Sequence, residues 1–209
     1  MGNGERVRAG FGIAIGLGLT GLVCSLLVGQ DLAGPLLIAP MGASAILMFA
    51  VPASPLAQPW SVVGGHLVAA LVGVSLAHWT AQPLVAAAIA VMVAMVVMSY
   101  LRCLHPPSGA IALIAVLGGP KVLAQGYGFV LVPVLLNSLV LTAAAFVYNN
   151  LTGRSYPHKA HAQPAIPAIV LTHQDLDSAL TAYGETLDIS REDLDVLFQD
   201  LVARAKRRS

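Results

Sequence analysis

Charged side chains are nearly absent from most of this 209-residue chain, and this absence restricts its class more than any other feature. Only 10% of the residues are charged, whereas ordinary soluble domains carry roughly 25%. Between Gly10 and Leu151 the charged residues are Asp31, Arg102 and Lys121. Together with a mean hydropathy of +0.79, this distribution excludes an ordinary soluble domain. It predicts one membrane domain followed by a polar tail.

Other absences exclude several kinds of chemistry. Cys24 and Cys103, the two cysteines, have no spacing typical of a metal site or a disulfide framework. The chain has no Gly-x-Ser-x-Gly, His-Glu-x-x-His or phosphate-loop motif, and no carboxylate pair in its apolar segments. A diffuse basic surface is also absent. We therefore expect no enzyme activity, no cofactor or metal, no nucleic-acid partner and no carboxylate proton relay.

Six apolar segments are present instead. Four are long enough to span a bilayer, which takes about 20 residues. The second is interrupted by Pro35 and Pro40, and the fifth has only about 14 residues, so each of these two is either a tilted span, a broken helix or a re-entrant half-helix. The approximate ranges are 9–29, 32–51, 60–80, 83–101, 106–119 and 126–149.

An internal repeat appears when the chain is compared with itself at an offset of 67 residues. Pro40-x-Gly42-Ala43 then matches Pro107-x-Gly109-Ala110, and Leu56-Ala-Gln58 matches Leu123-Ala-Gln125. Each half contains a long helix, a broken segment and a second long helix. The predicted fold is therefore an all-α membrane bundle of four long transmembrane helices and two broken or half-helix segments, arranged as two internal repeats. The halves are inverted if the broken segments cross the membrane and parallel if they re-enter.

The positive-inside rule gives the expected orientation. Arg6 and Arg8 precede the first segment, and Arg154 with further basic residues follows the last. Both termini are therefore expected in the cytoplasm, with the domain in the cell (inner) membrane. Four crossings with two re-entrant segments and six crossings both satisfy this.

The polar residues 102–109 between two uncharged runs are the first candidate site. Polar groups near a bilayer are costly, so a function is the default interpretation. A helix that starts at Pro107 would present free amides and a positive dipole end to a small anion. The alternative is a proline-initiated helix packed in the bundle. The candidates here are Arg102, His105, Pro106, Pro107, Ser108 and Gly109.

The repeat places a second candidate site at the helix start near Pro40. Gly42, Ala43 and Ser44 belong to it, although small residues there are equally typical of close helix packing. His66 and Asn137 complete the set of predicted binding residues, with a purely structural role as their alternative. Arg102 either neutralises the anion or extends to the cytoplasmic interface.

Composition divides the chain into three parts. We expect a transmembrane domain over 1–152, a linker over 153–170 and a cytoplasmic helical tail over 171–209. Thr172 precedes a short helix pattern at 173–183. Ser190 is an expected N-cap with Asp193 as its capping-box partner.

Three sequence blocks resemble the HPP family of integral membrane proteins, named for a His-Pro-Pro motif. They are Pro40–Pro59, Gly64-Gly65-His66 and His105–Ala110, and the resemblance covers roughly residues 8–150. Members from cyanobacteria and plant chloroplasts are nitrite transporters, so the resemblance implies a permease for nitrite or another small anion. The tail resembles the connector that leads into paired CBS domains in longer bacterial members.

The sequence thus predicts a permease or channel for a small monovalent anion, with nitrite as the first candidate, that binds near Pro40 and Pro107. Its partners would be this anion, the lipid bilayer and further copies of the chain. The competing hypothesis is a non-transporting membrane sensor or scaffold that signals through the cytoplasmic tail. The sequence does not distinguish a channel from a carrier.

Overall fold

The structure, a computed structural model, describes residues 2–28, 38–77, 79, 82–158, 172–184 and 188–206. It groups the chain into two compact units, Met1–His158 and Lys159–Ser209. The described residues form helices and connecting turns and contain no strand, which confirms the all-α fold. Pro35, one of the two prolines that interrupt the second apolar segment, lies outside the described residues.

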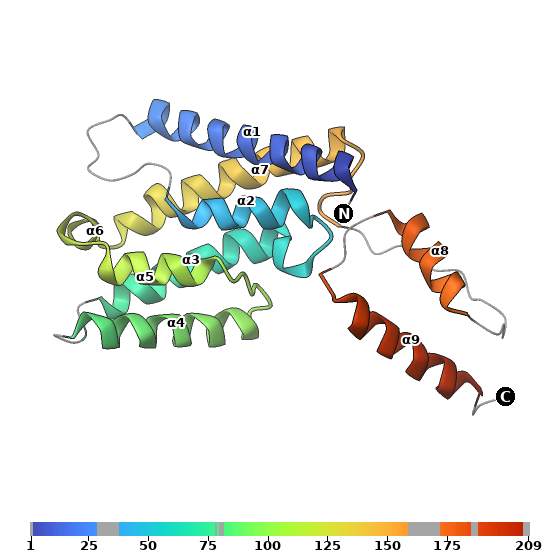
Figure 1. The fold of residues 1–209 in the computed structure, drawn as a ribbon. Coiled ribbons are helices and arrows are strands. Elements are labelled where there is room, and N and C mark those ends of the chain that lie inside the picture. Colours follow the sequence, from blue (N-terminus) through green and yellow to red (C-terminus); the bar gives the residue numbers. More distant parts are fainter. Residues whose placement is uncertain are drawn as a thin grey trace. The chain divides into compact units, whose positions relative to one another are not determined.

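The first unit contains the membrane bundle (Figure 1). Its elements are α1 (Asn3–Val28), α2 (Pro40–Ala50), η1 (Pro55–Ala57), α3 (Pro59–Leu76), α4 (Pro83–Tyr100), α5 (Ser108–Leu117), α6 (Pro120–Gln125), η2 (Val130–Leu135) and α7 (Leu136–Leu151). Residue Val132 of η2 has non-helical backbone angles and Pro133 lacks an amide, so the chain is kinked within η2, before α7 begins. Together η2 and α7 form one membrane-length segment, Val130–Leu151.

Proline defines where most of these helices begin. The first residues of α2, α3, α4 and α6 are Pro40, Pro59, Pro83 and Pro120, and α5 begins directly after Pro107. Proline fits the first helical turn because its fixed φ is helical and its missing amide would have no partner there. The predicted helix starts near Pro40 and Pro107 are therefore confirmed.

Among the described residues, four helical segments are long and apolar enough to cross a membrane, and two apolar helices are shorter, as predicted. The long segments are Asn3–Leu27, Pro59–Leu76, Pro83–Tyr100 and Val130–Leu151, and the shorter ones are α2 and α5. Eleven or ten helical residues rise about 15 Å, which is half of a hydrocarbon core of about 30 Å. The first helix starts at Asn3, several residues before the predicted segment, and so includes Glu5, Arg6 and Arg8.

A network of polar side chains joins the ends of several helices at one end of the bundle, which we call the Arg8 end. Arg8 forms an ion pair with Glu5 at 2.6 Å and donates hydrogen bonds to the Phe49 carbonyl at 2.7 Å and to Oδ1 of Asn149 at 2.9 Å. Arg154 pairs with Glu5 at 2.7 Å. The start of α1 and the last residues of α2 and α7 therefore lie side by side.

Side-chain contacts hold the α3 helix at both of its ends. The indole of Trp60, at the start of α3, donates to the Leu101 carbonyl that follows α4, at 3.1 Å. At the other end of α3, the Ser75 and Tyr127 hydroxyls are 3.0 Å apart. Trp60 and Tyr127 correspond in the repeat, and both are exposed, as expected of aromatic residues at the two membrane interfaces.

The two short helices occupy opposite halves of the bundle. In Figure 1, α2 lies toward the Arg8 end and α5 toward the Tyr127 end, and both begin near the middle. The chain reaches α5 from Leu101 at the Arg8 end and leaves it toward α6, so this segment runs from one end of the bundle to the other. Corresponding long helices run in opposite directions in the two halves, because α1 and α3 begin at the Arg8 end whereas α4 and α7 end there. The two halves are therefore inverted, which is the arrangement expected of a six-crossing topology.

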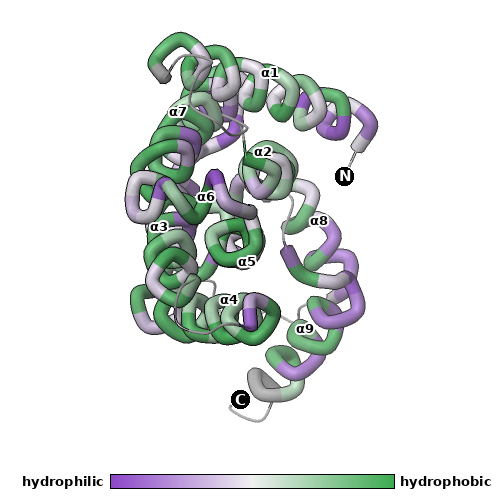
Figure 2. Tube along the Cα trace, turned by 90° about the vertical axis from the view of Figure 1, so that its left-hand side faces the viewer, coloured by the Kyte–Doolittle hydropathy of each residue, from purple (hydrophilic) through white to green (hydrophobic). Residues whose placement is uncertain are grey.

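Helix packing follows the same internal repeat. One group of helices in mutual contact is α1, α2 and α7, and the other is α4, α5 and α3. Exchanging the repeats, with α1 for α4, α2 for α5 and α3 for α7, converts one group into the other. Figure 2 shows the two groups in projection, with α2 and α5 between α1 and α4. This arrangement agrees with the duplication predicted from the sequence.

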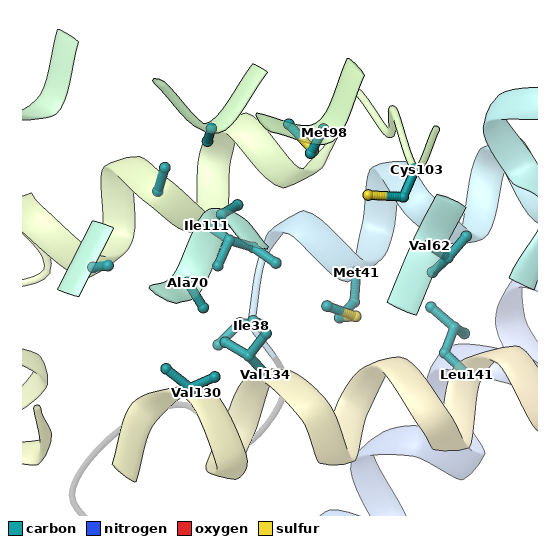
Figure 3. Packing of buried hydrophobic residues seen from close by; sticks show 14 of the residues in the cluster. Ile38, Met41, Val62, Ala70, Met98, Cys103, Ile111, Val130, Val134 and Leu141 are labelled. Atoms are coloured by element: carbon teal, nitrogen blue, oxygen red, sulfur yellow. The ribbon is translucent and has the colours of Figure 1, made fainter. Parts of the chain in front are cut away.

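The interior between the two groups is apolar and closely packed. Figure 3 shows Ile38, Met41, Ile111 and Val134 in this region, and each is at most 3% exposed. Glycine allows α3 and α5 to approach closely, since a Cβ at Gly73 would lie 2.6 Å from the Ala115 Cβ. Small residues at such contacts are typical of helix packing in membranes.

The second unit contains α8 (His173–Tyr183) and α9 (Arg191–Lys206). Thr172 and Asp175 form a reciprocal capping box at the start of α8, and the Asp193 amide donates to Oγ of Ser190 at 3.0 Å. These hydrogen bonds confirm both predicted helix starts. Arg191 joins the helices through its ion pair with Asp177 at 2.6 Å.

Candidate functional site

A cluster of two histidines and two serines lies inside the bundle, where the short helices begin. Oγ of Ser44 is 2.8 Å from Nε2 of His105 and 3.0 Å from Nε2 of His66. The two imidazole rings meet edge to face, with centroids 4.8 Å apart. Nδ1 of His66 lies 2.8 Å from Oγ of Ser138. All four side chains have an exposed fraction of 0%.

A backbone carbonyl fixes the orientation of the His105 imidazole. Nδ1 of His105 lies 2.8 Å from the Leu56 carbonyl oxygen, which can only accept a hydrogen bond. Nδ1 of His105 therefore carries a proton. In the neutral ring Nε2 is then an acceptor, and the Ser44 hydroxyl is placed to donate to it.

Gly65 allows α3 to approach the loop that carries His105. A Cβ at this position would lie 2.9 Å from the Cys103 carbonyl oxygen, from the His105 Cβ and from Oγ of Ser108. Contacts shorter than about 3.0 Å are essentially never made by a real Cβ, so glycine is required unless the loop moves. The residue before His66 thus brings the two histidine-bearing segments together.

Ser108 is the first residue of α5 and contributes a hydroxyl without a partner. Its side chain is 0% exposed, and Oγ makes no hydrogen bond within the described part of the chain. A buried polar atom without a partner costs free energy, on the order of 1–3 kcal/mol. Since Oγ of Ser108 and the His105 Cβ both border Gly65, this hydroxyl is available to a ligand bound beside the histidine cluster.

The backbone amides at the two helix starts are hydrogen-bonded, whereas the sequence predicted that they would be free. The amides of Ser108 and Gly109 donate to the carbonyls of His105 and Pro106, at 2.9 and 3.1 Å. The Met41 and Gly42 amides donate to Ile38 and Ala39, each at 3.0 Å. The expectation of free amides at these positions was wrong, because a tight turn before each helix supplies acceptors one residue closer than the α-helical spacing.

The other predicted site residues lie around the cluster or apart from it. Pro107, Gly109 and Gly42 are half-buried, while Pro106 and Ala43 are exposed. They form the helix starts but contribute no side-chain hydrogen bond.

Two further predicted residues do not join the cluster. Arg102 is exposed and adopts a left-handed backbone conformation, with φ of 53°, at the turn after α4. Asn137 is buried beside Ser138, and its amide donates to the Pro133 carbonyl at 2.7 Å, next to the kink. The structure does not place either of them in the histidine cluster.

Sequence reasoning missed Ser138 and the Leu56 carbonyl as cluster members. Ser138 could have been found, because it is a second polar residue beside Asn137 in an apolar helix. Nothing in the residue type at Leu56 indicates that its carbonyl accepts from an imidazole. That contact depends on how η1 folds over the bundle.

The chain after α7 remains attached to the bundle as far as His158. Tyr156 is 1% exposed and donates through its hydroxyl to the Ala57 carbonyl at 2.7 Å. Burial raises the pKa of the Tyr156 phenol. The His158 amide donates to Oε1 of Gln58 at 2.9 Å. The first residues of the predicted linker, 153–158, therefore belong structurally with the bundle. The region 159–171 lies outside the described residues.

No group of three or more potential metal ligands is present among the residues described. The chemistry available in the cluster is that of neutral hydrogen-bond donors and acceptors, two of which can also take up a proton.

Comparison with known proteins agrees with this architecture. Two curated transmembrane proteins of Dictyostelium discoideum are each 42% identical to the chain over 126 residues, which is 58% of its length. The matched part is 44% of one relative and 40% of the other, so the chain spans less than half of their length. No solved structure matches.

The family comparison covers the whole bundle. Residues 2–157 match the model of the HPP transmembrane region, and this range ends where the first compact unit ends, within one residue. It includes every helix described from α1 to α7, the histidine cluster and the Tyr156 contact. The chain therefore belongs to the HPP family of transmembrane proteins.

Proposed function

We propose that this protein is a membrane permease or channel for a small monovalent anion, with nitrite as the ion that the family resemblance implies. The observation that carries the proposal is the buried histidine cluster, with the buried Ser108 hydroxyl beside it, at the point where two half-helices begin. Short interrupted segments at matching places in two inverted repeats are typical of transporter binding sites.

The electrostatics of the cluster favour an anion over a cation. The positive dipole ends of α2 and α5, each equivalent to about half an elementary charge, lie near the middle of the bundle. Asp31 is the only acidic residue between Gly10 and Leu151. Since the first amides are occupied, the anion would be bound by the Ser44 and Ser108 hydroxyls and by imidazole N–H groups.

The packing favours a small ion. Gly65 and Gly73 bring α3 against the loop before α5 and against α5 itself, with almost no room for an added methyl group. The cluster is closed to solvent in this structure, so an ion reaches it only after the surrounding helices move. This property is typical of a carrier in an occluded state.

We further propose that the Arg8 end faces the cytoplasm. Arg6, Arg8 and Arg154 lie at this end, and Lys121 lies beyond the opposite end of α5. The positive-inside rule then predicts that both termini of the chain lie in the cytoplasm and that the protein lies in the cell (inner) membrane.

A second copy of the chain is the proposed partner for the outer faces of the short helices. Ala43 and Ile46 of α2 and Ala110 and Leu113 of α5 are exposed. The non-helical backbone of residues 101–107 reaches into the bundle beside α5, and lipid cannot satisfy its polar groups. A homo-oligomer covers this face with protein. Crosslinking of an Ala110→Cys variant in membranes would test this arrangement, and a purely monomeric product would contradict it.

The proposed transport is tested by anion flux in proteoliposomes of the purified full-length protein. Nitrite, nitrate, formate and chloride are compared, with His105→Ala as the site variant and His173→Ala, on the tail, as its matched control. We expect protein-dependent nitrite entry that His105→Ala removes and His173→Ala retains. Normal entry through a well-folded His105→Ala protein would contradict the proposed site.

Removal of the tail distinguishes transport from signalling. A chain ending at His158 keeps the Tyr156 contact and every helix of the bundle. Transport should survive this truncation, whereas a scaffold that signals through its tail would lose its function.

A further inference from the structure

The histidine cluster forms a continuous chain of hydrogen-bonding groups. It runs from Ser138 through His66 and Ser44 to His105, and ends at the Leu56 carbonyl. The four links have lengths of 2.8, 3.0, 2.8 and 2.8 Å. We infer that this chain is a proton relay, and that the proposed anion permease carries one proton together with each anion. This inference rests on the proposed function and adds the coupling ion to it.

The carbonyl at one end sets the direction of every bond in the neutral state. His105 donates from Nδ1 to Leu56, so its Nε2 accepts from the Ser44 hydroxyl. Ser44 can then accept from Nε2–H of His66. Nδ1 of His66 in turn accepts from the Ser138 hydroxyl. Each imidazole carries one proton, and every link has one donor and one acceptor.

A proton that enters at Nδ1 of His66 passes along the chain in two transfers. The Nε2–H bond of His66 breaks and its proton forms a new O–H bond on Ser44. At the same time the original Ser44 O–H bond breaks and its proton forms an N–H bond on Nε2 of His105. His66 is again neutral and His105 becomes an imidazolium. One proton is gained and no electrons are transferred.

The neighbouring groups also complete the hydrogen bonds of the state in which His105 is protonated. Ser44 now accepts from His105 and donates to His66, and Nδ1–H of His66 donates to Ser138. The Ser138 hydroxyl has a second acceptor, the Val134 carbonyl, at 2.7 Å. Ser44 likewise has the Pro40 carbonyl at 3.1 Å. Both proton positions therefore leave the cluster fully hydrogen-bonded. A relay requires this in both states, whereas two structural histidines require it in only one.

The His66 and His105 pair accommodates one extra proton rather than two. Two imidazolium rings with centroids 4.8 Å apart would repel strongly in an interior of low dielectric constant. A single positive charge at His105, by contrast, lies beside the unpartnered Ser108 hydroxyl. An anion that binds there would neutralise it, so proton and anion each favour binding of the other.

Within the described residues, no charged side chain hydrogen-bonds to either imidazole. On the elements packed against α2 and α3, Glu5 and Arg8 pair with each other at the Arg8 end, and Arg6 is exposed. The other titratable or charged groups described on these elements and the adjoining loops are Cys24, Tyr100, Arg102, Cys103, Tyr127, Tyr148, Arg154, Tyr156 and His158.

The experiment measures nitrite entry and internal pH together in proteoliposomes, with a pH-sensitive dye inside and protein-free liposomes subtracted. The membrane potential is set with potassium and valinomycin. One-to-one cotransport of a proton and a monovalent anion is electroneutral. We expect entry that is insensitive to the potential, that rises when the outside pH falls, and that acidifies the interior.

The variant His66→Gln removes the relay and leaves His105 and Ser108 in place. We expect its nitrite entry to lose its dependence on outside pH and to become sensitive to the membrane potential. His173→Gln, on the tail helix α8, is the matched control and should behave as the unmodified protein. Proton-coupled entry that persists in His66→Gln would overturn the relay.

A second measurement does not depend on transport. Nitrogen-15 NMR of histidine side chains in the purified protein follows the protonation of His66 and His105, assigned with His66→Gln. We expect the pair to take up one proton, with both rings changing in the same pH interval. Independent uptake of two protons would overturn the inference. No nitrite flux from folded protein would overturn the proposed permease, while the NMR titration still decides whether the relay exists.

Discussion

The Ser44 hydroxyl lies 2.8 Å from Nε2 of His105, a residue 61 positions later in the sequence. This contact joins α2 of the first repeat to the loop before α5 of the second, where the two short helices begin. Ser44 also contacts His66, so one hydroxyl connects both imidazoles. Its removal affects the whole cluster rather than a single hydrogen bond.

Ser44→Ala should therefore reduce nitrite entry by about tenfold, because one hydroxyl lost beside two imidazoles removes hydrogen bonds worth on the order of 1.4 kcal/mol or more. Ser44→Thr keeps the hydroxyl and should retain most of the entry. Proteoliposome flux gives the activity, and a thermal unfolding assay shows that both variants fold. Equal flux from Ser44→Ala and the unmodified protein would contradict the role of this contact.

Gly65→Ala should disrupt the approach of α3 to the His105 loop. The added Cβ would meet the Cys103 carbonyl oxygen, the His105 Cβ and Oγ of Ser108, each at 2.9 Å. Overpacking of this kind costs about 1–3 kcal/mol, so we expect a lower unfolding temperature and weak transport. Gly18→Ala is the matched control, since no atom lies within 4 Å of its Cβ position. An unchanged unfolding temperature for Gly65→Ala would count against this contact.

A topology with six crossings would place Arg102 and Lys121 on opposite sides of the membrane. Both side chains are exposed, at the two ends of the segment that contains α5. In a version with a re-entrant α5 they would lie on the same side. We expect an impermeant thiol reagent to label Lys121→Cys in intact cells. Arg102→Cys should be labelled only after the cells are permeabilised.

Labelling of both variants from outside would contradict the crossing of this segment. The reverse pattern, with Arg102→Cys labelled from outside, would keep the six crossings but reverse the proposed orientation. The buried native cysteines provide a background control in the unmodified protein.

Tyr156→Phe should remove the hydrogen bond to the Ala57 carbonyl and lower the free energy of unfolding by about 1 kcal/mol. Because burial raises the pKa of this phenol, the folded state holds its proton at a pH where the unfolded chain has lost it. Stability should thus fall as the pH rises above about 10, the ordinary tyrosine pKa. The decline should be shallower in Tyr156→Phe. Tyr100→Phe, at a residue 86% exposed, is the control, and an identical decline in both variants would contradict the burial effect.

Much of this fold could be predicted because the bilayer imposes simple requirements on sequence. The four long helices follow from apolar length, and the starts of α2, α3 and α4 follow from Pro40, Pro59 and Pro83. The inverted arrangement was one of two predicted alternatives. Apolar length alone could not select between them, since a re-entrant segment and a crossing half-helix have the same composition.

The candidate site was predictable only in part. Four polar residues stand out among apolar neighbours and lie together in the structure, namely Ser44, His66, His105 and Ser108. Arg102 stands out equally but is exposed, because its left-handed turn follows the end of α4 and lies outside the cluster. The contribution of the Leu56 carbonyl depends on tertiary structure, and no side-chain pattern encodes it.

The way the helices are grouped has a consequence for when protons can pass. Ser44 and Ser138 belong to the α1, α2 and α7 group, whereas His66 belongs to the α3, α4 and α5 group and His105 to the loop that leads into α5. All three side-chain links therefore connect one group to the other. Any separation of the groups that admits water and an ion breaks these links together. The same contacts thus join the two groups, so the relay is complete only while the bundle is closed.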